Sequence, residues 1–273
     1  MDRAIYLAMN GATQTMRAQT QAAHNLANVS TVGFRAEMAS LDRLPVVGDG
    51  LPSRVNVIER ARGADFSIGP QMSTGRELDV SIQGQGWIAV QGRDGSEGYT
   101  RAGDLEVNAD GLLVTATGLP VLGDAGPLSV PPFTKLDIGQ DGTVSVVPQG
   151  QGPETVASIG RIKLVNPQPT DMLRSGDGLM RMADGSQAPA DAAVTVISGV
   201  LEGSNVNPTR ALMEVISLSR QFEMQIRAIQ TADDNAEAAT RLLRVWFDRS
   251  SSRCFLHCGL PKLASTRNRR AWR

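Results

Sequence analysis

The sequence has little cysteine, little aromatic character and no long apolar run. Of its 273 residues, 4% are aromatic, two are His and two are Cys, and both cysteines, Cys254 and Cys258, lie among the last 28 residues. The cysteine-free residues 1–245 therefore carry no disulfide framework and no thiolate metal site. No stretch approaches 18 consecutive apolar residues, and the first one, Ile5 to Met9, is too short for a secretory signal. We expect no membrane insertion and no cleaved signal peptide.

Basic charge is also scarce outside the C-terminal end. The formal net charge is −1, but residues 246–273 contain seven basic residues and one acid, so residues 1–245 carry a net charge of −7. An acidic chain with scattered Lys and Arg and few aromatics lacks the basic patches and stacking surfaces of nucleic-acid-binding proteins. We therefore expect no nucleic-acid partner. The composition changes abruptly at residue 246, which predicts that residues 246–273 form an atypical, disordered basic tail.

Glycine and proline are nearly absent from both ends of the chain. Of the 28 Gly residues, 25 lie between Gly48 and Gly203, and 13 of the 14 Pro residues lie between Pro45 and Pro208. Within this middle part, short period-two apolar runs are separated by turn-forming Asp-Gly pairs, which are typical of antiparallel strands. The sequence predicts an α+β, mainly β fold: an extended linker at residues 36–77, then an antiparallel β sandwich or barrel at residues 78–203. The runs are Leu78/Val80/Ile82, Ile88/Val90, Leu105/Val107, Leu112/Val114, Leu136/Ile138, Val144/Val146, Ile162/Leu164 and Val194/Val196, and the pairs begin at Asp94, Asp110, Asp141, Asp177 and Asp184.

Both ends carry heptad-like series that predict long helices, within residues 1–35 and 204–245. Asn207-Pro208 suits the start of the second helix, because Asn caps and Pro fits the first helical position. Both seams are weakly apolar, so each helix needs a partner, and we expect the two to pair as a coiled coil and to form the assembly interface. The seam residues are Ile5, Met9, Ala12, Met16, Gln19, Ala23 and Leu26 in the first helix, and Val215, Leu218, Phe222, Gln225, Ile229, Ala232, Ala236, Ala239 and Leu243 in the second.

Motifs that could carry chemistry are weak. Gly84-Gln85-Gly86 leads into a strand rather than a helix, which favours a turn over a phosphate loop. The acidic run at Asp137–Gly142 lacks the closing Glu of a calcium loop. His24 is the one histidine in residues 1–245, and Cys254, His257 and Cys258 form only a metal-site fragment. We predict no catalytic residue, no metal and no cofactor, with carboxylate-based hydrolysis of cell-wall material as the remaining enzymatic alternative.

Three motifs resemble the flagellar rod and hook proteins of bacteria. The first runs from Asn25-Leu26-Ala27-Asn28 to Gly33-Phe34-Arg35 and is similar to the N-terminal signature of that family. The central residues 78–87, 99–104 and 109–111 resemble its β region, and Gly203-Ser204-Asn205-Val206-Asn207 with Phe222-Glu223 resembles its C-terminal motif. The resemblance covers residues 1–245, and the opening residues 1–9 are most similar to the proximal-rod members.

The resemblance implies a non-enzymatic structural subunit that polymerises through its terminal helices in the flagellar basal body and transmits torque across the periplasm. Its implied partners are itself, the other proximal and distal rod subunits, and the flagellar type III export apparatus. A distal-rod or hook paralogue is the alternative within the same family.

Overall fold

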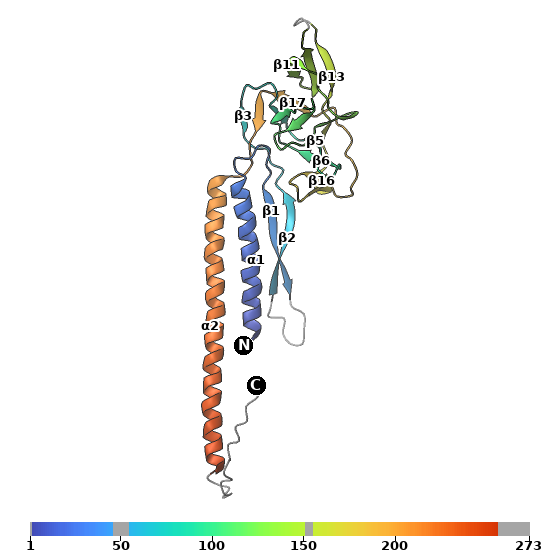
Figure 1. Ribbon diagram of the computed structural model, residues 1–273. Helices are drawn as coiled ribbons and strands as arrows, with labels where there is room; N and C mark the ends of the chain where they lie inside the picture. The colour runs from blue at the N-terminus through green and yellow to red at the C-terminus, as the bar shows by residue number, and fades with distance from the viewer. Residues whose placement is uncertain (1, 46–54, 151–154, 256–273) are drawn as a thin grey trace, which may run out of the picture. The chain divides into compact units, whose positions relative to one another are not determined.

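The computed structural model describes residues 2–45, 55–150 and 155–255. The fold is mainly β with two long helices, α1 (Asp2–Ala27) and α2 (Pro208–Phe255) (Figure 1). The chain divides into two compact units: residues 1–12 with 222–273, and residues 13–221. In the part of the chain that is described, neither helix has an apolar stretch long enough for a bilayer.

Local sequence explains where the helices begin and end. The N–H of Arg210 donates to Asn207 Oδ1 over 3.1 Å, so Asn207 caps α2, and Pro208 is its first residue as predicted. After α1, Asn28 Nδ2 donates to the His24 carbonyl over 2.9 Å, and Gly33 adopts φ +67°, which turns the chain away from the helix. Helix α2 continues to Phe255, ten residues beyond the predicted end at residue 245. Residues 256–273 of the predicted disordered tail lie outside the described residues.

The region predicted as an extended linker contains a long hairpin. Strands β1 (Glu37–Pro45) and β2 (Val55–Ala64) pair antiparallel from Glu37↔Ala64 to Pro45↔Val55, with one register shift between Met38 and Ala39 (Figure 1). Strand pairing thus gives the backbone N–H and C=O groups of this extended segment their hydrogen-bond partners.

Short strands fill the centre of the chain. They are β3 (Gln71–Ser73), β4 (Val80–Gln83), β5 (Trp87–Gln91), β6 (Glu97–Thr100), β7 (Leu105–Val107), β8 (Leu113–Thr115), β9 (Leu122–Gly123), β10 (Gly126–Pro127), β11 (Phe133–Ile138), β12 (Thr143–Pro148), β13 (Ala157–Arg161), β14 (Leu164–Val165), β15 (Met172–Arg174), β16 (Met180–Met182), β17 (Thr195–Ser198) and β18 (Val200–Glu202), with a 3-10 turn at Pro169–Asp171. The predicted period-two runs coincide with strands or border them, and the mainly β centre is confirmed.

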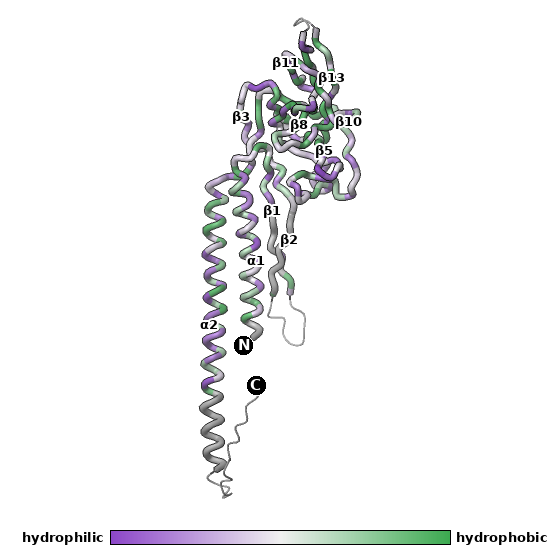
Figure 2. The backbone as a smooth tube through the Cα atoms, in the orientation of Figure 1, coloured by the Kyte–Doolittle hydropathy of each residue, from purple (hydrophilic) through white to green (hydrophobic). Residues whose placement is uncertain are grey.

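The largest sheet has the order β14-β5-β6-β16-β15 and is apolar on both faces. Along β5, Ile88 and Val90 belong to the main core, whereas Trp87 and Ala89 belong to a second core with Tyr99 and Met180. Alternate residues of a strand point to opposite faces, so this sheet separates the two cores. Figure 2 shows hydrophobic stretches alternating with hydrophilic ones through the strands of the β region.

The barrel, one of the two predicted arrangements, is not found among the described residues, where the strands form separate small sheets without closure. Many strands have only two or three residues, too few to carry a continuous ladder around a barrel. The Asp-Gly turns explain these frequent reversals. In all five predicted pairs the Gly adopts a positive φ between +72° and +85°, namely at Gly95, Gly111, Gly142, Gly178 and Gly185.

Candidate functional site: a buried junction between the ends of the chain

Three segments that are far apart in the sequence meet at a buried ionic cluster within the unit formed by residues 13–221. Arg35 follows α1, Arg101 follows β6, and Glu202 ends β18. Arg35 Nη2 lies 2.5 Å from Glu202 Oε1, and Arg101 Nη1 lies 2.7 Å from Glu202 Oε2. The side chains of both arginines are 3% exposed and that of Glu202 is 0% exposed. Water cannot screen such pairs, so they hold the segments strongly once they are formed.

The surroundings of Glu202 keep its carboxylate ionised. Burial alone would raise the pKa of Glu202, but Arg101, the Gly69 N–H at 2.9 Å and Arg35 together outweigh burial, and that pKa is lowered. For Arg101, burial lowers the pKa, whereas the charge of Glu202 opposes this change. Arg101 also donates to the Gly84 carbonyl over 2.7 Å and lies 5.6 Å from the centroid of the Trp87 ring. Glu202 is therefore the charged centre around which the two arginines are fixed.

The N-terminal motif holds the end of α1 on this cluster. Asn25 forms a two-way clamp with Glu37 at the start of β1: its Nδ2 donates to the Glu37 carbonyl, and its Oδ1 accepts from the Glu37 N–H over 2.9 Å. Gly33 donates its N–H to the Glu202 carbonyl over 2.7 Å. A Cβ at Gly33 would lie 2.2 Å from the Arg101 carbonyl carbon, so only glycine fits this approach. Phe34 is buried beside these groups.

The C-terminal motif is held by Asn205. Its Oδ1 accepts from the Ala36 N–H over 2.7 Å, and its Nδ2 donates to the Asp65 carbonyl over 2.9 Å. One side chain thus joins the segment before β1, the segment after β2 and the start of the C-terminal motif. Amides are suited to this position because they donate and accept at once.

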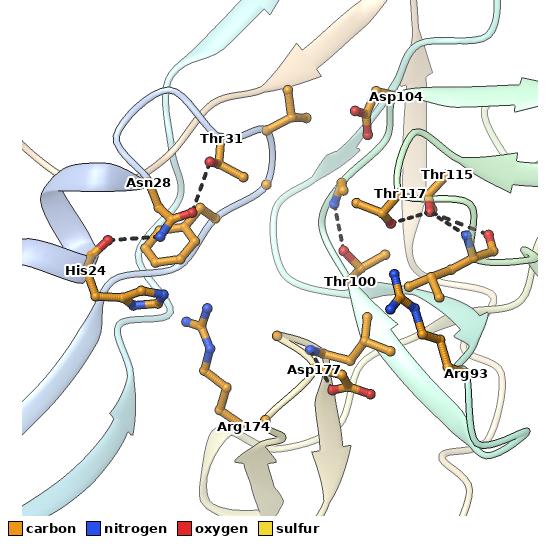
Figure 3. Close-up of a pocket in the computed structure, with 18 residues that line it drawn as sticks. His24, Asn28, Thr31, Arg93, Thr100, Asp104, Thr115, Thr117, Arg174 and Asp177 are labelled. Atoms are coloured by element: carbon orange, nitrogen blue, oxygen red, sulfur yellow. Dashed lines mark hydrogen bonds between the residues drawn. The ribbon is translucent and has the colours of Figure 1, made fainter. Parts of the chain in front are cut away.

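Arg174, from β15, completes the junction at its solvent side. Its Nη1 donates to the Arg35 carbonyl over 2.9 Å, its Nε lies 3.4 Å from Glu37 Oε1, and its guanidinium lies 4.8 Å from the centroid of the Phe34 ring. His24 Nδ1 also lies 3.4 Å from Glu37 Oε1. His24 and Arg174 both line a pocket of about 530 Å³. Figure 3 shows them on the same side of this pocket, opposite Arg93, Asp104 and Thr117.

The remaining signature residues lie at the end of α1. Leu26 and Asn28 are half-buried and Ala27 is exposed. Asn28 Oδ1 accepts from the Thr31 hydroxyl over 3.1 Å, which helps to close the turn after the helix (Figure 3). Asn28 and Gly33 are thus the motif residues that shape this turn.

The predicted seam of α2 coincides with the less exposed side of that helix. All its members with a described side chain are half-buried: Val215, Leu218, Phe222, Gln225, Ile229, Ala232, Ala236 and Ala239. The side chain of Leu243 lies outside the described residues. Other apolar side chains of α2 remain open, including Met213 at 61% exposed, Ile216 at 46% and Met224 at 61%.

In α1 the predicted seam residues occupy two heptad positions, and these two positions differ in solvent exposure. Ala12 is buried, and Ile5, Gln19 and Leu26, which share its position at intervals of seven residues, are half-buried. Met9, Met16 and Ala23 form the other position and are exposed, Met9 by 51% and Met16 by 60%. The covered stripe instead includes the small residues Ala8, Thr15 and Ala22.

The weak chemical motifs are located in turns. Gly84-Gln85-Gly86 connects β4 to β5, and Asp141 Oδ1 accepts from the Thr143 N–H over 3.1 Å in the turn between β11 and β12. The described residues contain no group of three or more His, Cys, Asp and Glu side chains arranged to hold a metal ion. His257 and Cys258 lie outside them, as does the side chain of Cys254.

Sequence reasoning did not identify the ionic cluster. Arg35 and Arg101 lie within the family motifs, but nothing in those motifs pairs them with Glu202. The available signal was Glu202 itself, a charged residue directly after the apolar pair Val200-Leu201. Its partners are 167 and 101 residues away in the chain, so the sequence alone could not join them.

Comparisons with known proteins agree with the motifs. Residues 197–242 match the family described as flagellar basal body rod FlgEFG protein C-terminal, and residues 81–146 match the flagellar hook protein FlgE/F/G D1 domain. The chain is 46% identical to the flagellar basal-body rod protein FlgF of Escherichia coli strain K12, over 89% of this chain and 99% of that protein. It is 45% identical to FlgF of Salmonella typhimurium, with the same coverage. The flagellar basal-body rod protein FlgG of Agrobacterium fabrum is 30% identical over 89% of this chain and 100% of that protein.

Proposed function

Since this chain belongs to the flagellar basal-body rod protein family, we propose that it is a non-enzymatic structural subunit of the flagellar rod, stationed in the proximal segment. The observation that carries the proposal is the 46% identity to a FlgF protein over nearly its full length. Identity to a FlgG protein over an equal share of the chain is 30%, which favours the FlgF station over the distal alternative.

Assembly through the terminal helices is the mechanism we propose. Within the unit formed by residues 1–12 and 222–273, Gly11 lies so close to α2 that a Cβ there would be 3.2 Å from the Gln225 side chain. This approach, together with the half-buried stripe of α2, supports pairing of the two helices as a coiled coil.

A second set of apolar side chains is available for contacts between subunits. Met213, Ile216 and Met224 are spaced by three and eight residues, so they share one face of α2, and Met16 is 60% exposed on α1. Burying these side chains against neighbouring subunits would drive polymerisation. If each contact joins two different faces, a helical array of such contacts extends without closing.

The buried junction suits a subunit that carries torque. Arg35, Arg101 and Glu202 connect the end of α1, the β domain and the segment before α2 through pairs that water does not screen. Breaking a buried pair by loss of one partner costs about 3–5 kcal/mol, so the junction should resist rotation of the β domain against the helices.

We further propose that the subunit reaches the periplasmic rod through the flagellar type III export apparatus. Residues 1–245 contain no Cys, so they cannot form disulfides that would obstruct export of an unfolded chain or mispair in an oxidising compartment. The partners are then the export apparatus, other copies of this chain and neighbouring proximal and distal rod subunits.

The assembly proposal is tested by comparing two positions of α2. Met224→Asp places a charge on the exposed apolar face, so the purified monomer should keep its unfolding temperature while a cell expressing only this variant loses its rods and motility. Phe222→Asp, in the half-buried stripe, should also weaken helix pairing within the monomer. Gln230→Asp, at an exposed polar position of the same helix, is the matched control and should assemble. Normal motility of the Met224→Asp cell would contradict this assembly mechanism.

The proximal station is tested separately by labelling this subunit in isolated basal bodies and imaging them by electron microscopy. Label at the inner-membrane end of the rod is expected. Label confined to the outer part of the rod or to the hook would favour the paralogue alternatives.

A further inference from the structure

The methionines of the β domain core and those of α2 differ sharply in exposure. Met172 and Met180 belong to the second core and are 4% and 3% exposed, whereas Met213 and Met224 of α2 are each 61% exposed. The thioether of Met is oxidised to a sulfoxide where an oxidant can reach its sulfur. Met213 and Met224 are therefore accessible to an oxidant in the free subunit, and the two core methionines are protected.

Met213 and Met224 lie at nearly the same angle around α2. They are eleven residues apart, which is about three helical turns, so they lie about 16–17 Å apart along the same side of the helix. Ile216, which is 46% exposed, lies between them on that side. Oxidation at these two positions would therefore change one continuous apolar face.

Exposed arginines stand within about one helical turn of each of these methionines. Arg210 precedes Met213 by three residues, and Arg220 and Arg227 flank Met224 at four and three residues. Residues at these spacings are neighbours on a helix surface, and each guanidinium carries five N–H donors. A sulfoxide oxygen on either methionine can accept hydrogen bonds from these donors and from water while the face is open to solvent. The free subunit therefore tolerates the modification.

From the exposure of these two side chains and the face that they share, we propose that Met213 and Met224 form a redox-sensitive modification site whose oxidation blocks addition of the subunit to the rod. The proposal rests on the proposed assembly through this face of α2. Hydrogen peroxide is the oxidant: a sulfur lone pair attacks one peroxide oxygen, and the S–O bond forms as the O–O bond breaks. Sulfur loses two electrons, and the second peroxide oxygen leaves as water. A methionine sulfoxide reductase reverses the step with electrons from thiols.

The modification acts on the contact between subunits. An unmodified Met is apolar and flexible, so it packs well against a neighbouring surface. A sulfoxide in the same contact loses its water and must be buried among groups that suit a thioether. A polar group buried without a hydrogen-bond partner weakens the association by about five- to 150-fold. Two such groups on one face are enough to prevent a subunit from adding to the rod.

Oxidation of the purified full chain tests the chemistry without reference to assembly. After brief treatment with hydrogen peroxide, mass spectrometry of the digested chain should find Met213 and Met224 oxidised at least about tenfold faster than Met172 and Met180, because the core must open before its sulfur atoms react. Equal rates at the four positions would overturn the proposal.

Variants in cells test the consequence for the rod. Met213→Gln combined with Met224→Gln places polar groups of similar length on the face, so this double variant should keep the Tm of the original chain but form at least about tenfold fewer rods per cell. Met213→Leu combined with Met224→Leu stays apolar and cannot be oxidised. It should form rods even at hydrogen peroxide levels that stop rod formation by the original chain. Met72→Gln, at a 48% exposed position of β3, is the matched control and should assemble.

The outcomes separate this proposal from the assembly mechanism on which it rests. If Met224→Asp stops rod formation but the double Gln variant assembles normally, the face is an assembly surface and the redox proposal is wrong. If Met224→Asp also assembles, the assembly mechanism fails and the redox proposal fails with it. Equal loss of rods in peroxide by the original chain and the double Leu variant would assign the effect to another protein and overturn the proposal.

Discussion

Removing the charge of Glu202 is the most direct test of the buried junction. Glu202→Gln keeps the shape of the side chain but removes the negative charge shared by Arg35 at 2.5 Å and Arg101 at 2.7 Å. Gln has one carbonyl oxygen, so it can accept from one arginine while its NH₂ group faces the other donor. Two buried guanidinium groups then lose their carboxylate.

The expected loss is set by this burial. Breaking a fully buried ion pair by removing one partner costs about 3–5 kcal/mol. For a chain of this size each kcal/mol lowers Tm by about 2–4 °C, so the variant should melt about 6–20 °C lower at neutral pH. Glu237→Gln is the control, because Glu237 and Arg241 form an exposed pair on α2 at 3.1 Å with exposed fractions of 66% and 81%. Its loss should be under about 0.5 kcal/mol.

The pH dependence separates loss of charge from loss of packing. The pKa of Glu202 is lowered in the folded chain, so its stabilisation is fully present above the ordinary value of 4.5 and is lost as the pH falls through the folded value. Denaturant unfolding followed by circular dichroism should therefore show a gap between the original chain and Glu202→Gln that is wide at pH 7 and narrows below pH 4.5. A loss under about 1 kcal/mol at pH 7, or a gap unchanged by acid, would refute the assigned role of Glu202.

Two further predictions concern glycine packing and a buried phenol. Gly33→Ala should destabilise the chain by about 2–4 kcal/mol in urea unfolding, because φ +67° and the 2.2 Å approach to the Arg101 backbone both oppose a Cβ. Gly95→Ala, with φ +79° and open space around it, should cost only about 1–2 kcal/mol, and equal losses for the two would contradict the close approach. Burial raises the pKa of Tyr99 from 10.0 to about 12, so stability should fall as the pH rises from 10 toward 12 while the unfolded chain ionises first. When Tm is measured from pH 10 to 12, Tyr99→Phe should no longer show this fall in stability. A fall of the same size in the variant would assign the effect to another titrating group.

The turns and strands of the centre could be predicted because their signals are local. Asp-Gly at residues 94, 141 and 184 specifies a reversal through the positive φ of the glycine and the Asp side chain that accepts from the residue two positions on. Sheet closure depends on which strands become neighbours. Period-two runs such as Ile88/Val90 do not encode that order, and for this reason the barrel alternative of the prediction was wrong.

The junction is non-local in the same way. Asn25, Gly33 and Phe34 could be selected because a family motif contains them. Their partners Glu37, Arg101 and Arg174 are specified by the fold that brings the segments together. Glu202 was detectable only as a charge at the end of an apolar strand, and nothing in its neighbourhood indicated two arginines more than 100 residues away.

The heptad pattern located an apolar seam on each terminal helix, but it did not show which residues of α1 are covered in the folded chain. In α1 the heptad series joined Ile5 and Ala12 to Met9 and Met16 because these residues follow one another in alternating steps of four and three. The covered stripe instead takes Ala8, Thr15 and Ala22, whose small side chains permit close backbone approach, and leaves the methionines exposed. Flexible Met side chains adapt to irregular surfaces, which suits contacts with neighbours that differ along an assembly. Under the proposed assembly mechanism, one stripe would pack within the chain and the other against the next subunit, so folding of the helical ends and growth of the rod would stabilise each other.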